Sequence, residues 1–204
     1  MLVPAMTLPE IRNEVLKDLV IVKRKIVYVS QRIIKEARKH HLKSDERFMD
    51  YLSTQKNTWI FHFKYEHKEV YIGLIVYYYG VNGLAALTID MKEEVLHYHT
   101  GHFFKRYNER RNLGLVKPED IIRVYIKDNT QISYQPLEKI ATGIQTIFGV
   151  ITTGIVLGHR NSNLKILLLS TYITHEMLKG QQLKMEDYLK SKLSSYKPDF
   201  EKAE

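Results

Sequence analysis

The sequence contains no cysteine among its 204 residues. This absence excludes disulfide bonds, thiolate metal sites and a cysteine nucleophile, and it agrees with a reducing compartment. The chain also has no apolar run close to the roughly 20 residues that cross a bilayer as a helix. Its first residues, MLVPAMTLPEIRNE, lack the basic and then apolar order of a secretory signal peptide. We therefore expect a cytoplasmic protein with no membrane partner.

The signatures of several enzyme classes are missing as well. The sequence has no Gly-x-x-x-x-Gly-Lys-Ser/Thr of a P-loop, no Rossmann fingerprint and no serine in a nucleophile elbow. The pair His175-Glu176 is not followed by the second histidine of a zincin helix. The sequence therefore predicts no cofactor.

Positive charge is in excess and unevenly distributed. The formal net charge is +8 and the pI is about 9.4. Residues 1–48 carry a net +5, residues 49–96 a net −2, residues 97–131 a net +3 and residues 132–204 a net +2. A basic surface favours nucleic acid or an anionic membrane as a partner, although many soluble proteins are basic without binding either.

The first 48 residues are typical of helix. Apolar residues recur every three or four positions over residues 8–39, Thr7 is suited to cap the start, and Glu10 follows it at capping-box spacing. The middle of this segment, VIVKRKIVYV, is rich in β-branched residues and allows a break or a strand. We interpret KHHLKSDER as a loop.

The pattern then changes to strands. TWIFHFKYE alternates, EHKE and VNG are turn signals, and VYIGLIVYYYG, GLAALTID and VLHYHT continue an antiparallel meander of three or four strands. We predict helices at 101–112 and from Pro118 onward. We interpret TQISYQPLEKIATGIQ as a loop and a short helix. One strand is predicted in TIFGVITTGIVLGHR and another in LKILLLSTYIT. A C-terminal helix is predicted in HEMLKGQQLKMEDYLKSKL, with a weak point at Gly180.

These elements predict an α+β fold, an antiparallel sheet (a meander plus a later hairpin) packed with N-terminal, central and C-terminal helices. We expect a single domain over residues 1–204. Within it, residues 1–48 form a helical extension, residues 49–193 a sheet-containing core, and residues 194–204 a flexible tail.

Residues 97–114, HYHTGHFFKRYNERRNLG, are the first candidate site. On a helix, His102, Arg106 and Arg110 recur every four residues and share one face. Histidine transfers protons near neutral pH and arginine stabilises phosphate charge, so the three residues suit metal-free cleavage of RNA. A solvated helix face, with Arg111 as a solvated neighbour, explains the same pattern without any function.

The same stretch allows a weaker metal hypothesis. His97 and His99 point to one side if residues 97–99 are extended, and His102 then begins the helix. Three imidazoles can bind zinc. No carboxylate holds an obvious ligand position, although Asp90, Glu93 and Glu94 lie upstream.

Two further segments offer polar groups. In STYITHEM, residues 170–177, hydroxyls lie where a strand gives way to a helix, which suits either phosphate binding or simple capping. In GHRNSN, residues 158–163, His159 and Arg160 occupy a predicted hairpin turn and could contact RNA.

In order along the chain, HTGHFFKRYNERR, the strands TTGIVLG and LKILLLSTYIT, and a helix starting HEML resemble the barnase, EndoU, colicin and RelE-type ribonuclease superfamily. The resemblance covers roughly residues 84–182. It implies metal-independent cleavage of RNA by attack of the ribose 2′-OH on its own phosphate, as in toxin or phage-associated enzymes. Two extra histidines and the large basic N-terminal segment depart from the family pattern.

The resemblance also implies roles for individual residues. His102 would act as general acid or base, Arg106 and Arg110 would stabilise the phosphorane, and Thr171 and Tyr172 would hold a phosphate oxygen or position the nucleotide. RNA is then the expected partner, together with an inhibitor or partner protein. The alternative is a non-catalytic protein that binds nucleic acid or another protein. In that case Tyr77 and Tyr79, on one face of a strand, could stack bases if the N-terminal helices do not bury them.

Overall fold

The computed structural model describes residues 1–81, 83–90, 94–129 and 131–195. Its helices and strands, in chain order, are α1 (Leu8–Lys39), β1 (Ser44–Leu52), β2 (Thr58–Glu66), β3 (Glu69–Gly80), β4 (Gly83–Asp90), β5 (Val95–His99), α2 (Gly101–Arg110), α3 (Pro118–Asp128), β6 (Ser133–Ala141), β7 (Ile144–Ile151), β8 (Gly154–Asn161), β9 (Ile166–Ile173), a short 3-10 helix (His175–Met177) and α4 (Gln181–Ser195). The predicted α+β class is confirmed. Asn82 of the predicted turn and residues 196–204 of the predicted tail lie outside the described residues.

Within the described residues, nine strands form one sheet in the order β1-β2-β3-β4-β5-β9-β8-β7-β6. Each strand pairs antiparallel with its neighbour in sequence, except where β5 and β9 meet in parallel, with Leu96 opposite Ile166. The sheet therefore consists of a five-strand meander and a four-strand meander, joined by one parallel pair. The sequence predicts a shorter first meander and only a hairpin in the second part.

The first helix is longer and more regular than its sequence suggests. α1 runs unbroken through the β-branched segment because Val22 and Ile26 lie on its buried side. Its start has the predicted capping box, in which Glu10 accepts hydrogen bonds from the backbone and side chain of Thr7, both at 2.7 Å. The predicted break or strand in this helix is wrong.

Two edge strands and one hairpin depart from the sequence prediction. β1 occupies much of the predicted loop at KHHLKSDER, and β6 replaces the predicted loop and short helix. Both lie at sheet edges, where exposed polar residues obscure the alternation that marks a strand. TIFGVITTGIVLGHR forms two strands, because the chain turns at residues 152–153.

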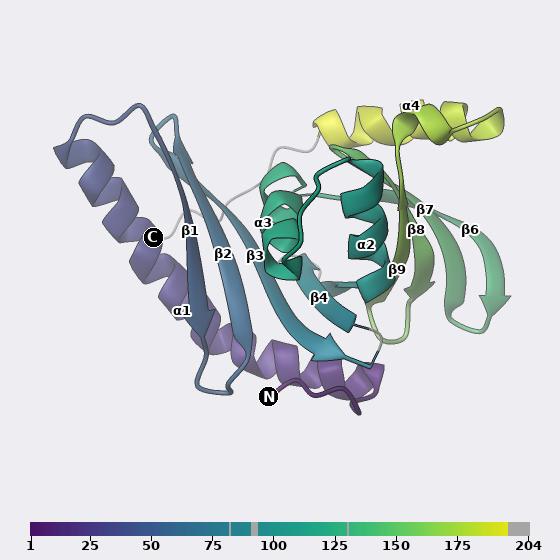
Figure 1. Cartoon of the computed structure of the whole chain (residues 1–204), viewed down its shortest axis with the longest axis horizontal. Helices are drawn as coiled ribbons and strands as arrows, with labels where there is room; N and C mark the ends of the chain where they lie inside the picture. Colours follow the sequence, from purple (N-terminus) through teal and green to yellow (C-terminus); the bar gives the residue numbers. More distant parts are fainter. Residues whose placement is uncertain (82, 91–93, 130, 196–204) are drawn as a thin grey trace.

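Helices cover both faces of the sheet (Figure 1). α1 lies behind β1–β3 and packs on aromatic residues of β2, including Trp59, Phe61 and Phe63. α2 and α3 lie in front and bury Phe103, Tyr107 and other residues against the opposite face. The predicted boundary at residue 48 therefore falls inside β1, and α1 contributes to a main core rather than to an extension.

α4 covers a third region. Its Leu189 packs with Phe148 and Val150 of β7, at the end of the sheet farthest in strand order from β1. The outer side of α1 is exposed to solvent, and so is the flank of α4 next to the edge strand β6.

Candidate functional site

The start of α2 places the first predicted pair of residues together. Thr100 caps the helix by accepting a hydrogen bond from the Phe103 backbone at 3.2 Å. His102 is exposed, and the Nε of Arg106 donates to its Nε2 at 3.4 Å. Arg106 also pairs with Glu109 at 3.1 Å. The chain thus presents an imidazole and a guanidinium to solvent on one side of α2.

The two arginines at the end of α2 contact other parts of the protein. Arg110 donates to the backbone carbonyl of Tyr172. Arg111 pairs with Asp128 at 3.3 Å and lies over the Tyr107 ring, so it is not the solvated neighbour that the sequence suggests. Arg110 follows His102 by eight positions, so the two residues are about 12 Å apart along the helix axis.

Tyr172 is a core residue. Its side chain is fully buried, its ring contacts Phe103 and Tyr107 at centroid distances of 6.3 and 4.9 Å, and its hydroxyl donates to the Thr153 carbonyl at 2.5 Å. Both its ring and its hydroxyl are therefore engaged by the protein. The same cluster includes Asn129, which accepts two hydrogen bonds from Thr153.

Thr171 lies on the other face of the sheet from Tyr172. Side chains alternate along a strand, and a register shift pairs Thr171 with Leu157 but Leu169 with Gly158. The shift leaves Ser170 as an extra residue, a β-bulge. Because Tyr172 faces α2, Thr171 faces away from it. The structure therefore brings His102 to Arg106 and Arg110 to Tyr172, and it does not bring Thr171 to either pair.

The predicted turn at 158–163 is wrong for its first four residues, since residues 158–161, with His159 and Arg160, belong to β8. It ends β8 and leads into β9, with Asn161 opposite Ile166. Six strand residues separate Ile166 from Tyr172, about 20 Å along β9. The guanidinium of Arg160 lies 5.8 Å from the centre of the Tyr134 ring. His159 and Arg160 lie opposite Leu168 and Leu167 of β9.

The histidines of the metal hypothesis do not converge. His99 is fully buried, its Nε2 is 2.8 Å from the Tyr125 hydroxyl, and its ring packs against Phe103. His102 points into solvent from the next element. In the part of the chain that the structure describes, no three His, Asp or Glu side chains are grouped as metal ligands. His99 is instead a neutral core residue.

Burial gives these histidines a pH signature. Desolvation lowers the pKa of His99 from 6.5 to about 3 and that of His97 to about 4. The unfolded chain takes up these protons near pH 6.5 and the folded chain does not, so folding stability is full above that pH and falls as the pH drops toward 3. We expect His99→Phe to reduce the slope of unfolding free energy against pH between pH 4 and 6.5 by up to about 1.4 kcal/mol per pH unit. Urea titrations across this range measure the slope, and an unchanged slope would contradict the assignment.

The tyrosine pair on β3 lies on the α3 side of the sheet and not beneath α1. Tyr79 is 54% exposed and its hydroxyl donates to Glu119, while Tyr77 is half-buried. Burial raises the pKa of Tyr77, and the charges of Glu119 and Asp50 raise it further. Carboxylates at both rings repel a phosphate chain, so this exposed pair is a poor platform for nucleic acid.

The largest concentration of unpaired positive charge is on the outer side of α1. We call the residues that form it the basic face: Lys23, Arg24, Lys35, Arg38 and Lys39. All five are exposed, and none makes an ion pair with another described residue. Arg24 and Lys35 are eleven residues apart, three helical turns, so they lie on one side of the helix.

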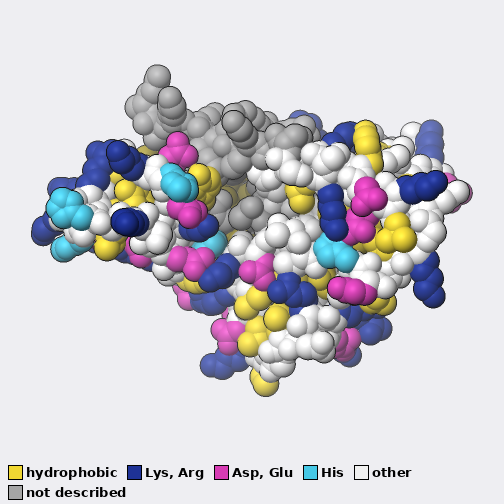
Figure 2. All heavy atoms as spheres, turned by 90° about the horizontal axis from the view of Figure 1, so that it is seen from above, with side chains coloured by type: hydrophobic (Ala, Val, Ile, Leu, Met, Phe, Trp, Pro, Cys, Tyr) yellow, Lys and Arg dark blue, Asp and Glu magenta, His cyan; other side chains and the backbone are white. Residues whose placement is uncertain are grey.

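The segment that contains this face is strongly positive. Residues 17–43 contain nine Lys and Arg against Asp18 and Glu36, a net +7, whereas the whole chain carries +8. Asp18 is fully buried, and Glu36 accepts from Arg47 at 2.7 Å and from Arg32 at 3.4 Å. Figure 2 shows Lys, Arg and His side chains gathered at the end of the molecule where α1 ends. The net +5 of residues 1–48 is the sequence signal for this face, although it does not identify the residues.

Comparisons of the chain with protein-family models, curated proteins and solved structures found no match. Among the described residues, no helix is long and apolar enough to cross a membrane.

Proposed function

We propose that this protein binds nucleic acid through the basic face of α1 and contacts phosphates rather than bases. The observation that carries the proposal is that five exposed cations without an ion-pair partner among the described residues lie on α1, within a segment (residues 17–43) of net charge +7. Arg24 and Arg38 lie on the same side of α1 and are fourteen residues apart, so the face spans about 21 Å. A row of cations on this scale meets several consecutive phosphates and gains affinity by releasing their counterions.

Other basic residues are less suited to this role. Arg106 pairs with Glu109 and Arg111 with Asp128, and Arg110 holds a backbone carbonyl. On the exposed half of α1 beyond residue 17, Glu36 is the single acid among the described residues, and two arginines neutralise it. Phosphate therefore meets the least opposing charge on the basic face.

Removing three charges from this face tests the proposal. We expect the triple variant Lys35→Gln, Arg38→Gln, Lys39→Gln to bind a labelled single-stranded RNA of roughly 20 nucleotides at least tenfold more weakly at low salt. The slope of log affinity against log salt should fall by about 2, since each phosphate contact contributes about 0.7. Fluorescence anisotropy across a salt series measures both, with DNA of the same sequence in parallel.

A second triple variant with the same net charge provides the control. The substitutions Lys105→Gln, Lys117→Gln and Lys179→Gln remove three exposed cations that lie outside α1. We expect this variant to bind as the parent does. If it loses as much affinity as the α1 variant, only overall charge matters and the assignment to the basic face is wrong.

A second candidate function is metal-independent cleavage of RNA, favoured by the exposed contact between His102 and Arg106. In this mechanism His102 transfers a proton and Arg106 stabilises phosphate charge. The binding proposal expects RNA to remain full length after incubation with chelator. Cleavage that disappears in His102→Ala and persists in His40→Ala would establish the enzyme instead.

A further inference from the structure

Two tyrosines near the end of β3 form a corner that solvent reaches. Tyr77 and Tyr79 project from the same side of the strand, and their rings lie nearly perpendicular, at 79°, with 6.5 Å between the ring centres. Tyr79 is 54% exposed and Tyr77 is half-buried. β2 begins at Thr58, opposite Tyr77, and therefore stops short of Tyr79. We call these two rings the aromatic corner.

A charged carboxylate lies at the rim of the aromatic corner. The Tyr79 hydroxyl donates a hydrogen bond to Glu119, the second residue of α3. This hydrogen bond is the main cause that lowers the pKa of Glu119 below its ordinary value, so the group is ionised at neutral pH. Among the described residues no cation forms an ion pair with Glu119, whereas the nearby Asp50 is held by Arg123 at 2.6 Å. Glu119 therefore supplies negative charge beside the rings.

The aromatic corner has the chemistry of a cation site. The face of an aromatic ring attracts positive charge, and perpendicular rings allow one cation to contact both. The carboxylate that makes the pair unsuited to phosphate attracts a positive ligand for the same reason. An ordinary ammonium is strongly hydrated and loses that hydration on reaching a ring. A methylated ammonium presents apolar methyl groups to the rings, so it is the better match.

We propose that the aromatic corner and Glu119 bind a trimethylammonium group. The methyl groups contact the rings of Tyr77 and Tyr79. Glu119 attracts the positive charge while it continues to accept from the Tyr79 hydroxyl. Such a group occurs on small molecules such as choline and on trimethylated lysine side chains, and aromatic residues recognise both.

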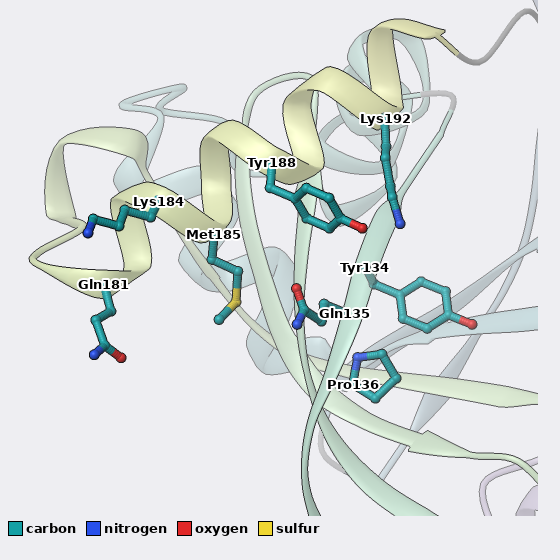
Figure 3. Close-up of a pocket in the computed structure, with 8 residues that line it drawn as sticks. All are labelled: Tyr134, Gln135, Pro136, Gln181, Lys184, Met185, Tyr188 and Lys192. Atoms are coloured by element: carbon teal, nitrogen blue, oxygen red, sulfur yellow. The ribbon is translucent and has the colours of Figure 1, made fainter.

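The groove of about 690 Å³ between α4 and β6 contains another exposed tyrosine but a different arrangement (Figure 3). Tyr188 is 51% exposed, and the Lys192 ammonium already lies 4.5 Å from the centre of its ring. Figure 3 shows the side chains of Lys184 and Lys192 leaving α4 in different directions. Because a cation of the protein already lies at its ring, Tyr188 matches Tyr79 in exposure but not in the proposed role.

The aromatic corner is independent of the basic face of α1. It lies on β3 beside α3, in front of the sheet, whereas α1 lies behind the same strands (Figure 1). The two sites share no residue. Either proposal can therefore fail without affecting the other.

Titration of the isotope-labelled full chain with choline, followed by NMR at constant ionic strength, tests the proposal. We expect the backbone amides of Tyr77, Tyr79 and Glu119 to shift and to saturate at millimolar choline. Dimethylbutanol, the uncharged carbon isostere of choline, should bind roughly tenfold more weakly because it has no charge for the rings to attract. A short peptide with one trimethyllysine distinguishes the source of the group. Tighter binding than choline identifies a modified protein, and equal or weaker binding identifies a small molecule.

Three variants locate the site. Tyr79→Leu removes one ring and should weaken choline binding roughly fivefold. Glu119→Gln should weaken the binding of choline but leave that of dimethylbutanol unchanged. Tyr188→Leu is the matched control and should bind choline as the parent does.

Circular dichroism confirms that each variant is folded. The proposal is overturned if millimolar choline gives no saturable shifts, or if dimethylbutanol binds as tightly as choline. It is equally overturned if Tyr79→Leu binds choline as the parent does, or if Tyr188→Leu loses as much affinity as Tyr79→Leu.

Discussion

Gly158→Ala is expected to destabilise the protein by about 4 kcal/mol or more. A Cβ atom at Gly158 would lie 1.9 Å from the Leu168 carbonyl oxygen and 2.9 Å from its carbon. These are backbone atoms of the paired strand β9, so no side-chain rotation relieves the overlap. Ordinary overpacking costs about 1–3 kcal/mol, and a backbone clash exceeds it. Typical domains have only about 5–15 kcal/mol to lose.

The clash follows from the β-bulge. At Gly158 the register shifts, and Ser170 is left as an extra residue that brings the β9 backbone close to β8. Gly80→Ala is the matched control, since a Cβ there meets its nearest backbone atom at 3.5 Å, an ordinary contact. We expect that variant to stay within about 1 kcal/mol of the parent. Urea unfolding followed by circular dichroism separates the two, and equal midpoints would refute the clash.

Asp18→Ala has the second large expected effect, a loss of about 3 kcal/mol. The fully buried Oδ2 of Asp18 accepts hydrogen bonds from Trp59 Nε1 at 2.7 Å and Asn57 Nδ2 at 3.0 Å. Alanine leaves both donors buried without this partner, and each such group costs about 1–3 kcal/mol. Asn57 also accepts from the Leu2 backbone at 2.7 Å, so the change loosens the packing before α1.

Two comparisons locate the cause of that loss. Asp18→Asn keeps one oxygen acceptor and should lose less stability than alanine. Lys17→Ala changes the preceding, exposed residue of α1 and should stay within about 0.5 kcal/mol of the parent. Denaturant unfolding monitored by the fluorescence of Trp59, the one tryptophan, reports on this site directly. A loss in Lys17→Ala as large as that in Asp18→Ala would show that the effect does not come from the buried carboxylate.

Strong periodicity made part of the fold predictable. The apolar spacing of α1 and the alternation of β2 indicated both elements, although the sequence left a break open within α1 and β2 is buried on both faces. The edge strands β1 and β6 were missed because solvent covers much of their surface. The parallel contact of β5 with β9 has no local signal, since it depends on how α2 and α3 return the chain.

The candidate site was predictable to a smaller extent. The four-residue spacing correctly placed His102 beside Arg106, since a helix repeats nearly every four residues. The bulge at Ser170 could not be foreseen from alternation, and it determines that Tyr172 rather than Thr171 meets α2. The burial of Tyr172 likewise depends on Phe103 and Tyr107, which reach it only in the folded chain.

The single parallel pair also shapes how this chain folds. Every other strand pair joins consecutive strands, so each meander closes through short loops at small entropic cost. Pairing Leu96 with Ile166 instead closes a loop of seventy residues that contains α2, α3 and three strands. Contacts of such long range form slowly. We therefore expect the two meanders to form first and the β5–β9 pair to close late in folding.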